Sequence, residues 1–467
     1  MLNFSASEVK YLFFLRLAYF LLLCCLVVFL SRFRLHGILA PLSGGIALIV
    51  FTYGILQKFL IFPWILAQAD WDRSPYSLAL RAKVASGRIF AIFPLPTLYA
   101  MVCGILLIAI IHYFFKAIGW PKVFWAVLFL LGAGNLFLTQ SFGGIIFFTA
   151  GALFYLFFSG IFKIKYLAPL LMAAALLFSL VVALRFSEAS GLQPAKLRFA
   201  NWLQAGRVIG SAPLLGVGLG NYETAVPAHV LQGEPASIYA HNFFLQMAAE
   251  IGVPWFFFIA LFSLPWMKKN FKKFLQAENS LFTSICLLIL LFNMFDVGNY
   301  FFTAGIAFAI AFSQVFAVAG RSRWGYFAAI ALCASLVLVN EVSSDRQRAA
   351  DLSFVRGETA RAEGYYLQAL RFNPWSYRAL LGRAAIAQKN NDPSGAERLF
   401  ARTLSVYPGH AYANYMLSHA ALRRGAYLTA MAYAGRAMQA NKKNKPYQRW
   451  HEFIKANIAH RLTLSGN

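Results

Sequence analysis

Residues 11–30 read YLFFLRLAYFLLLCCLVVFL, an apolar run of 20 residues with a single charge at Arg16. An α-helix needs about 20 apolar residues to cross the roughly 30 Å of hydrocarbon in a bilayer. The rest of the 467-residue chain has the same character, with 60% hydrophobic and 13% charged residues and a mean hydropathy of +0.61. This composition excludes an ordinary soluble domain and predicts a multi-pass, all-α membrane protein.

Further apolar blocks of similar length follow, and each is predicted to be a membrane span. The block 37–67 is too long for one upright helix and contains Gln57, Lys58 and Pro63, so it is either one tilted, kinked span or two elements. The expected total is therefore ten or eleven transmembrane helices. The predicted spans cover residues 11–30, 37–67, 93–115, 123–139, 143–161, 166–185, 251–267, 280–298, 301–319 and 326–340.

Short basic loops predict the orientation, because loops on the cytoplasmic side are enriched in Lys and Arg. They recur at every second turn: Lys116 with Lys122, Lys163 with Lys165, KKNFKK at 268–273, and Arg321 with Arg323. The opposite side of the membrane then holds residues 68–92, the segment 186–250 and everything after 341. The net charge of +25 fits these loops and contact with anionic membrane lipids. Because no basic stripe with an aromatic platform occurs, no nucleic-acid partner is expected.

A different pattern begins near residue 343, where charged residues become frequent and a period of 34 residues emerges. Ala362, Ala396 and Ala430 are in step with this period. The pattern resembles tetratricopeptide repeats, whose stacked helix pairs usually bind a protein partner. The chain is therefore divided into a membrane domain, residues 1–340, and a helical-repeat domain on the non-cytoplasmic side, residues 341–467. The alternative is an unrelated helical tail.

The segment 186–250 is the longest polar stretch between predicted spans, and long connections in compact proteins are usually functional or disordered. Residues 197–208, LRFANWLQAGRV, have the pattern of an amphipathic helix. The glycine-rich stretch PLLGVGLGNY follows at 213–222, and a second helix is expected to begin near His241. The site is therefore predicted within this large non-cytoplasmic loop.

Several of these residues form a recognisable set. Arg198 with a tryptophan four residues on, the stretch PLLGVGLGNY, and His241 followed by Asn242 together resemble the O-antigen ligase and polymerase superfamily. Upstream, GRIFAIFP at 87–94 is similar to another stretch of that family. The resemblance covers roughly residues 85–320. It implies a glycosyltransferase that moves a glycan from an undecaprenyl diphosphate carrier to an acceptor hydroxyl at the periplasmic membrane face.

One position departs from the family pattern. Members often carry Ser-Arg-Gly after the span that ends near residue 140, and that arginine is proposed to contact the lipid diphosphate. Here residues 140–143 read QSFG. Because Phe142 cannot bind phosphate, Arg88, Arg185 or Arg207 is expected to substitute, or this chain handles its donor differently.

His241 and Arg198 are the expected catalytic residues. Histidine has an ordinary pKa near 6.5 and can accept a hydroxyl proton near neutral pH, whereas arginine donates two hydrogen bonds to a phosphate from a fixed plane. The alternative roles are a structural cap for His241 and a lipid-headgroup contact for Arg198. Arg207 lies nine residues beyond Arg198, on the opposite face of a straight helix unless Gly206 ends it. Glu250, nine residues beyond His241, should likewise point away from that histidine.

Two further features allow other interpretations. Asp70 and Asp72 could hold a divalent metal, although two carboxylates are few for a hard cation, so a metal-independent enzyme without a cofactor is expected. Asp296 lies near the external end of a span and is a candidate partner for an arginine. Additional contacts to the diphosphate or sugar are expected from Arg88, Arg207, Asn242, Gln246 and Tyr222.

The glycines at positions 216, 218 and 220 lack the preceding strand of a dinucleotide-binding fold, so such a site is excluded. They either present backbone N–H groups to a phosphate or permit close packing of the loop.

The sequence therefore predicts transfer of a lipid-linked glycan, with ligation to lipid A core first, polymerisation of a second glycan chain next, and transfer to a protein such as pilin third. The repeats add weight to the second and third alternatives because they usually bind a partner. From another class, a non-enzymatic membrane scaffold or lipid-linked glycan transporter remains open. Glycan, acceptor and oligomeric state are not specified by the sequence.

Overall fold

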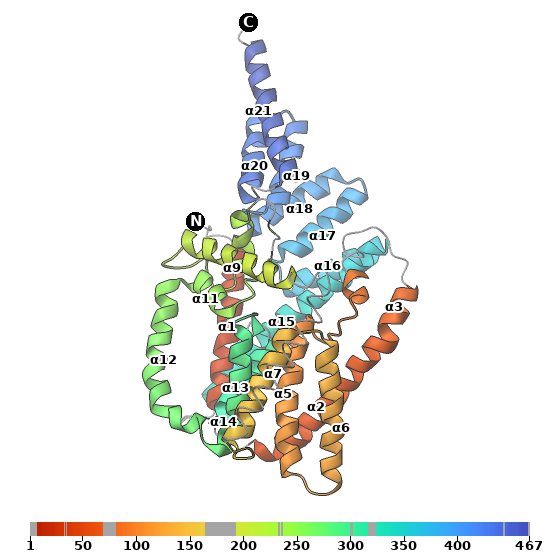
Figure 1. The fold of residues 1–467 in the computed structure, drawn as a ribbon. Coiled ribbons are helices and arrows are strands. Elements are labelled where there is room, and N and C mark those ends of the chain that lie inside the picture. The colour runs from red at the N-terminus through yellow and green to blue at the C-terminus, as the bar shows by residue number, and fades with distance from the viewer. Residues whose placement is uncertain are drawn as a thin grey trace.

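A computed structural model of the chain describes residues 7–31, 33, 35–68, 81–163, 193–231, 234, 237–298, 302–315, 324–441 and 444–465. Within these ranges the regular elements are helices, and none is a strand, in agreement with the predicted all-α class. Figure 1 shows a helical bundle at one end, a layer of shorter helices across its top, and stacked helix pairs beyond that layer.

The bundle is built around α5 (Pro96–Lys116), which is buried along most of its length. It packs against α6, α7 and α13, while α1 packs against α14 and the start of α15. The surrounding bundle helices are α1 (Ser7–Leu30), α2 (His36–Leu56), α6 (Trp120–Leu138), α7 (Phe142–Phe158), α13 (Ser280–Asn293), α14 (Phe302–Val315) and α15 (Trp324–Val355).

Several of these helices are suited to crossing a membrane. Among the described residues, four helical stretches are long and apolar enough: Phe13–Leu30, Gly37–Ala67, Pro96–Lys116 and Trp120–Leu138. A bent pair, Lys268–Phe274 with Ala277–Asn293, could add a fifth, and two apolar helices are shorter. The protein is therefore a multi-pass membrane protein. The predicted span 166–185 lies outside the described residues, so the count of ten or eleven stays a prediction.

The long block 37–67 forms one continuous helical stretch with a π-helical turn, η1 (Gln57–Ile61), between α2 and α3 (Phe62–Gln68). The polar residues in this turn bind the segment that precedes α5. The Gln57 side chain accepts from the N–H groups of Phe90 and Ala91, both at 2.8 Å, and Lys58 Nζ donates to the carbonyl of Gly87 at 2.9 Å. Together, the side chains of Gln57 and Lys58 therefore hold the GRIFAIFP segment at the end of the bundle.

The layer above the bundle contains α9 (Gln193–Ser211), α10 (Tyr222–Ala225), η3 (Val226–His229) and α11 (Phe243–Ile251), and α12 (Val253–Phe274) leads away from it. α9 and α11 pack against each other and share a small apolar core. This core fixes the two helices that carry most of the predicted site residues.

Beyond this layer, α15 continues into three helix pairs, so the predicted domain boundary at 340 falls inside one helix. The first helices of the pairs begin at Thr359, Pro393 and Tyr427, 34 residues apart, and the second helices repeat with the same spacing. Ala362, Ala396 and Ala430 are all buried where the helices touch. The helices are α16 (Thr359–Phe372), α17 (Tyr377–Lys389), α18 (Pro393–Val406), α19 (Ala411–Arg423), α20 (Tyr427–Ala440) and α21 (Lys445–Ser465).

These helix pairs contact the layer that holds the predicted site. Arg378 forms an ion pair with Glu223, and the Tyr407 hydroxyl donates to the backbone carbonyl of Thr224 at 3.0 Å. The rings of Tyr377 and Tyr407 lie against each other beside this contact. The repeats are therefore joined to α10 directly, and not only through α15.

His410 makes this part of the molecule sensitive to acid. Burial and then the nearby Arg378 charge lower the pKa of His410 from 6.5 to about 4, and its Nδ1 accepts the N–H of Ala413 as the cap of α19. The unfolded chain binds the proton more readily, so the contribution of His410 is complete above pH 6.5 and is lost as the pH falls toward 4. The expected loss is about 3 kcal/mol.

Hydrogen exchange of residues 411–423 in the full-length protein measures this effect. After correction for intrinsic rates, protection should fall between pH 6.5 and 4. His410→Asn keeps a capping side chain without the titration and should flatten that dependence. Equal slopes for the two proteins would contradict the role given to His410.

Candidate active site

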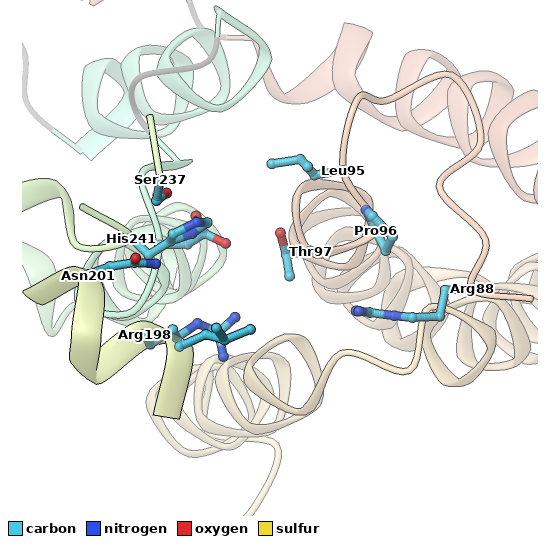
Figure 2. A pocket seen from close by; sticks show the side chains of 10 residues that line it. Arg88, Leu95, Pro96, Thr97, Arg198, Asn201, Ser237 and His241 are labelled. Atoms are coloured by element: carbon cyan, nitrogen blue, oxygen red, sulfur yellow. The ribbon is translucent and has the colours of Figure 1, made fainter. Parts of the chain in front are cut away.

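A cavity of about 350 Å³ lies between the N-terminus of α5, the first turns of α9 and the residues just before α11. Figure 2 shows that its side chains come from two facing walls, one with Arg88 and the start of α5 and the other with α9 and His241. The lining residues are Arg88, Leu95, Pro96, Thr97, Leu197, Arg198, Asn201, Ser237, His241 and Asp296.

His241 is held in an uncommon backbone conformation, with φ of +51°. Such angles are rare outside glycine and persist when the surroundings impose them. Here the Trp202 indole donates to the His241 carbonyl at 3.1 Å, and Asn242 begins the cap of α11. The surrounding structure therefore fixes the backbone that presents this imidazole to the cavity.

The imidazole is paired with a buried carboxylate. His241 Nδ1 lies 3.2 Å from Asp296 Oδ1, and the two side chains are 27% and 5% exposed. Burial by itself would raise the pKa of Asp296, but the hydrogen bond and charge of His241, helped by the Val297 N–H and by Arg198, bring that pKa below its ordinary value. With Nδ1–H donating to the ionised carboxylate, Nε2 carries the lone pair and can accept a proton.

Two guanidinium groups line the same cavity. Arg198 lies on α9, on the wall that carries His241, and has no hydrogen-bond or ion-pair partner among the residues described here. Arg88 lies on the facing wall, where its Nε donates to the Thr139 carbonyl at 3.0 Å. An anion in the cavity would therefore meet positive charge from both walls.

Arg207 lies elsewhere. α9 runs through Gly206 to Ser211, so Arg207 points to the opposite face from Arg198. Its Nε donates to the His229 carbonyl at 2.8 Å, and its guanidinium pairs with Glu234. In this structure Arg207 holds the loop after α10 and does not line the cavity.

Asn242 and Gln246 also have structural partners. Asn242 Oδ1 accepts the Leu245 N–H at 3.0 Å as the cap of α11, and its Nδ2 donates to the Met294 carbonyl at 2.8 Å. Gln246 is buried and accepts the Ala240 N–H at 3.2 Å. Both side chains brace the backbone on either side of His241, and neither lines the cavity.

The glycine-rich stretch before α10 packs tightly against α11. The N–H of Gly218 donates to the backbone carbonyl of Glu250 and that of Gly220 donates to its carboxylate, at 2.9 and 2.7 Å. A Cβ on Gly216 would lie 2.3 Å from the Glu250 carbonyl oxygen. Tyr222 is buried beneath this stretch. Its glycines therefore permit close packing, and two of its N–H groups are engaged within the protein.

Three lining residues acquire importance only from the structure. Asp296 is 55 residues from His241 in the sequence. It was predicted to pair with an arginine, whereas in the structure its side chain pairs with the imidazole of His241. Asn201 follows Arg198 by three residues, so helical spacing on α9 could have predicted their shared face. Thr97 was assigned to the interior of a span, whereas Pro96 marks the first turn of α5.

The alternative metal site cannot be placed, because Asp70 and Asp72 lie outside the described residues, as does Arg185. Within the described ranges no group of three or more His, Cys, Asp or Glu side chains is arranged to hold a metal ion.

Comparison with known protein families agrees with this geometry. The family model described as O-antigen ligase matches residues 126–260, which include α9, the glycine-rich stretch, His241 and α11. No curated protein matches the chain.

Proposed function

We propose that this chain, whose residues 126–260 match the O-antigen ligase family model, transfers a glycan from undecaprenyl diphosphate to an acceptor hydroxyl at the periplasmic face of the bacterial inner membrane. The observation that carries the proposal is the convergence of the paired imidazole of His241 and two guanidinium groups on one cavity. The superfamily is one of glycan transferases.

The geometry supports a single displacement. His241 Nε2 takes the proton of the acceptor hydroxyl while the acceptor oxygen forms a bond to the anomeric carbon. The bond from that carbon to the diphosphate oxygen breaks, and the diphosphate leaves with the electron pair. Asp296 stabilises the imidazolium, and Arg198 with Arg88 neutralises the developing charge of the leaving group. No metal or cofactor takes part in these steps as proposed.

Arg88 is suited to replace the family arginine that is missing at Phe142. Its Nε donates to the carbonyl of Thr139, at the corner between α6 and α7 where QSFG stands. A guanidinium supplied from residue 88 therefore reaches the place where the family supplies one from the corner itself. Gln57 and Lys58 position the segment that carries Arg88. This role explains why polar residues occur at these positions of an otherwise apolar helix.

Arg198→Lys should lower the initial rate of glycan transfer about tenfold. Lysine keeps the positive charge but loses the planar fork that can donate two hydrogen bonds to a diphosphate. The initial rate with purified lipid-linked glycan measures the effect. Arg207→Lys is the matched control on the same helix, because Arg207 faces Glu234 and not the cavity. Equal losses in both variants would contradict the role given to Arg198.

Among acceptors, we place lipid A core first. The contact between Arg378 of the repeats and Glu223 of α10 supports a second possibility, in which a protein partner or a protein acceptor reaches the site through the repeats. Polymerisation onto another lipid-linked chain fits the same chemistry.

Product identity separates these acceptors. The purified full-length protein is given undecaprenyl diphosphate glycan with lipid A core, a second lipid-linked chain and pilin as competing acceptors, with and without EDTA. We expect product on lipid A core and no effect of EDTA. Product on another acceptor would change the subclass, EDTA sensitivity would favour a metal at Asp70 and Asp72, and no product on any acceptor would favour a scaffold or transporter.

A further inference from the structure

The first turn of α5 faces the cavity without a cap. Leu95 stands at the N-cap position and offers no side-chain acceptor, and Pro96 has no N–H. The first backbone bond of the helix runs from the N–H of Tyr99 to the carbonyl of Leu95. The N–H groups of Thr97 and Leu98 therefore have no acceptor among the described residues.

Such a helix end attracts anions. The exposed N–H groups and the aligned peptide dipoles of a 21-residue helix give its N-terminus a partial positive charge. Figure 2 places Thr97 and its hydroxyl in the centre of the cavity, between Arg88 on one side and the wall of His241 on the other. A phosphate at this point would meet the helix end, a hydroxyl donor and a guanidinium together.

An independent observation on the opposite wall also indicates a ligand. Asn201 lines the cavity, is only 5% exposed, and its Oδ1 has no hydrogen-bond partner among the described residues. Buried polar side chains are nearly always paired, so an unpaired amide oxygen at a cavity is explained by a ligand that donates to it. Phosphate oxygens do not donate, whereas sugar hydroxyls do.

We propose that the N-terminal turn of α5, through the Thr97 hydroxyl and the N–H groups of Thr97 and Leu98, binds the diphosphate, and that Asn201 accepts a hydrogen bond from a hydroxyl of the first sugar. This assignment rests on the proposed function. It separates two subsites within the cavity, with the diphosphate at the start of α5 between Arg88 and Arg198, and the first sugar beside Asn201 and His241.

Binding of glycan-free undecaprenyl diphosphate in nanodiscs tests the diphosphate subsite. Thr97→Val keeps the shape of the side chain but removes the hydroxyl, and should weaken binding about tenfold. Thr97→Ser restores the hydroxyl and should rescue most of that loss. Thr97→Asp should weaken binding about a hundredfold by repulsion while keeping the melting temperature, because an acidic residue stabilises the first turn of a helix. Wild-type affinity in Thr97→Val and Thr97→Asp would overturn the assignment.

A comparison of two lipids tests the sugar subsite. Asn201→Leu is of similar size, and its affinity for glycan-free undecaprenyl diphosphate should stay within about twofold of wild type. Its affinity for the glycan-bearing lipid should fall about tenfold, because only that lipid supplies the hydroxyl. Equal changes for both lipids would overturn the role of Asn201.

The His241→Ala background separates this proposal from the proposed function. If His241→Ala binds the lipid normally and responds to Thr97→Val as wild type does, the subsite stands whether or not transfer occurs. If wild type binds the lipid tightly but substitutions at Thr97 and Asn201 do not change the affinity, the two subsites are wrong and the proposed function still stands. If wild type binds no lipid diphosphate, both fail.

Discussion

His241→Ala is expected to lower the initial rate of glycan transfer at least about a thousandfold. The variant removes the group that accepts the acceptor proton, and general-base catalysis by a positioned side chain contributes roughly 10²–10⁴-fold. It also removes the positive charge that would form on the imidazolium beside Asp296. Cells that depend on this protein for transfer should therefore lose the ladder of glycan products on gels, and the purified variant should show the rate loss directly.

A matched control tests whether the lower transfer rate reflects lost catalysis and not poor folding or expression. His229, the last residue of η3, does not line the cavity, so His229→Ala should retain transfer at a normal expression level. The His241→Ala protein should still bind undecaprenyl diphosphate, because the proposed diphosphate contacts lie at Arg198, Arg88 and α5. Unchanged ladders in His241→Ala at normal expression would remove the imidazole from the mechanism.

Asp296→Asn is expected to lower kcat about a hundredfold with little change in KM. The amide keeps the size of the side chain but carries no charge, so it cannot stabilise an imidazolium at His241. It can also donate to Nδ1, which would leave the proton on Nε2 and block that nitrogen as a base. KM should change little, because the Asp296 side chain is paired with the imidazole and, among the described contacts, makes no hydrogen bond to Arg198 or Arg88.

A pH profile distinguishes this positioning role from a merely structural one. In wild type the pKa of Asp296 is below its ordinary value, so the carboxylate is ionised throughout the neutral range. Loss of that charge should change the pH dependence of kcat relative to wild type. The Asp296→Asn protein should keep a cooperative melting transition, which shows that it is folded. An unchanged pH profile of kcat, together with a change in KM as large as the change in kcat, would contradict the pairing of Asp296 with His241.

Local patterns in the sequence predicted much of the architecture. Length and hydropathy predicted a helical multi-pass membrane protein, and the period of 34 residues predicted helix pairs, whose first helices begin at Thr359, Pro393 and Tyr427 in the structure. Helical geometry also predicted that Arg198 and Arg207 face apart. These predictions were possible because each depends on a local property of the sequence: the length of an apolar run, a repeat period, or the spacing of residues along one helix.

Contacts between distant segments could not be predicted in this way. The partner of His241 comes from the turn after α13, and Arg88 reaches the cavity because Gln57 holds its segment from within another helix. A pattern at one position does not report which carboxylate or guanidinium lies opposite it after folding. For the same reason Asn242 and Gln246 were expected to contact the diphosphate or sugar, whereas in the fold their side chains brace the backbone around His241.

The measurement that tests the central claim most directly is a cryo-electron microscopy structure of the full-length protein with bound undecaprenyl diphosphate. The account predicts density for the diphosphate in the cavity between α5 and α9, within hydrogen-bond reach of Arg198 and Thr97 and beside His241. Diphosphate density at any other place on the protein, with this cavity unoccupied, would contradict it.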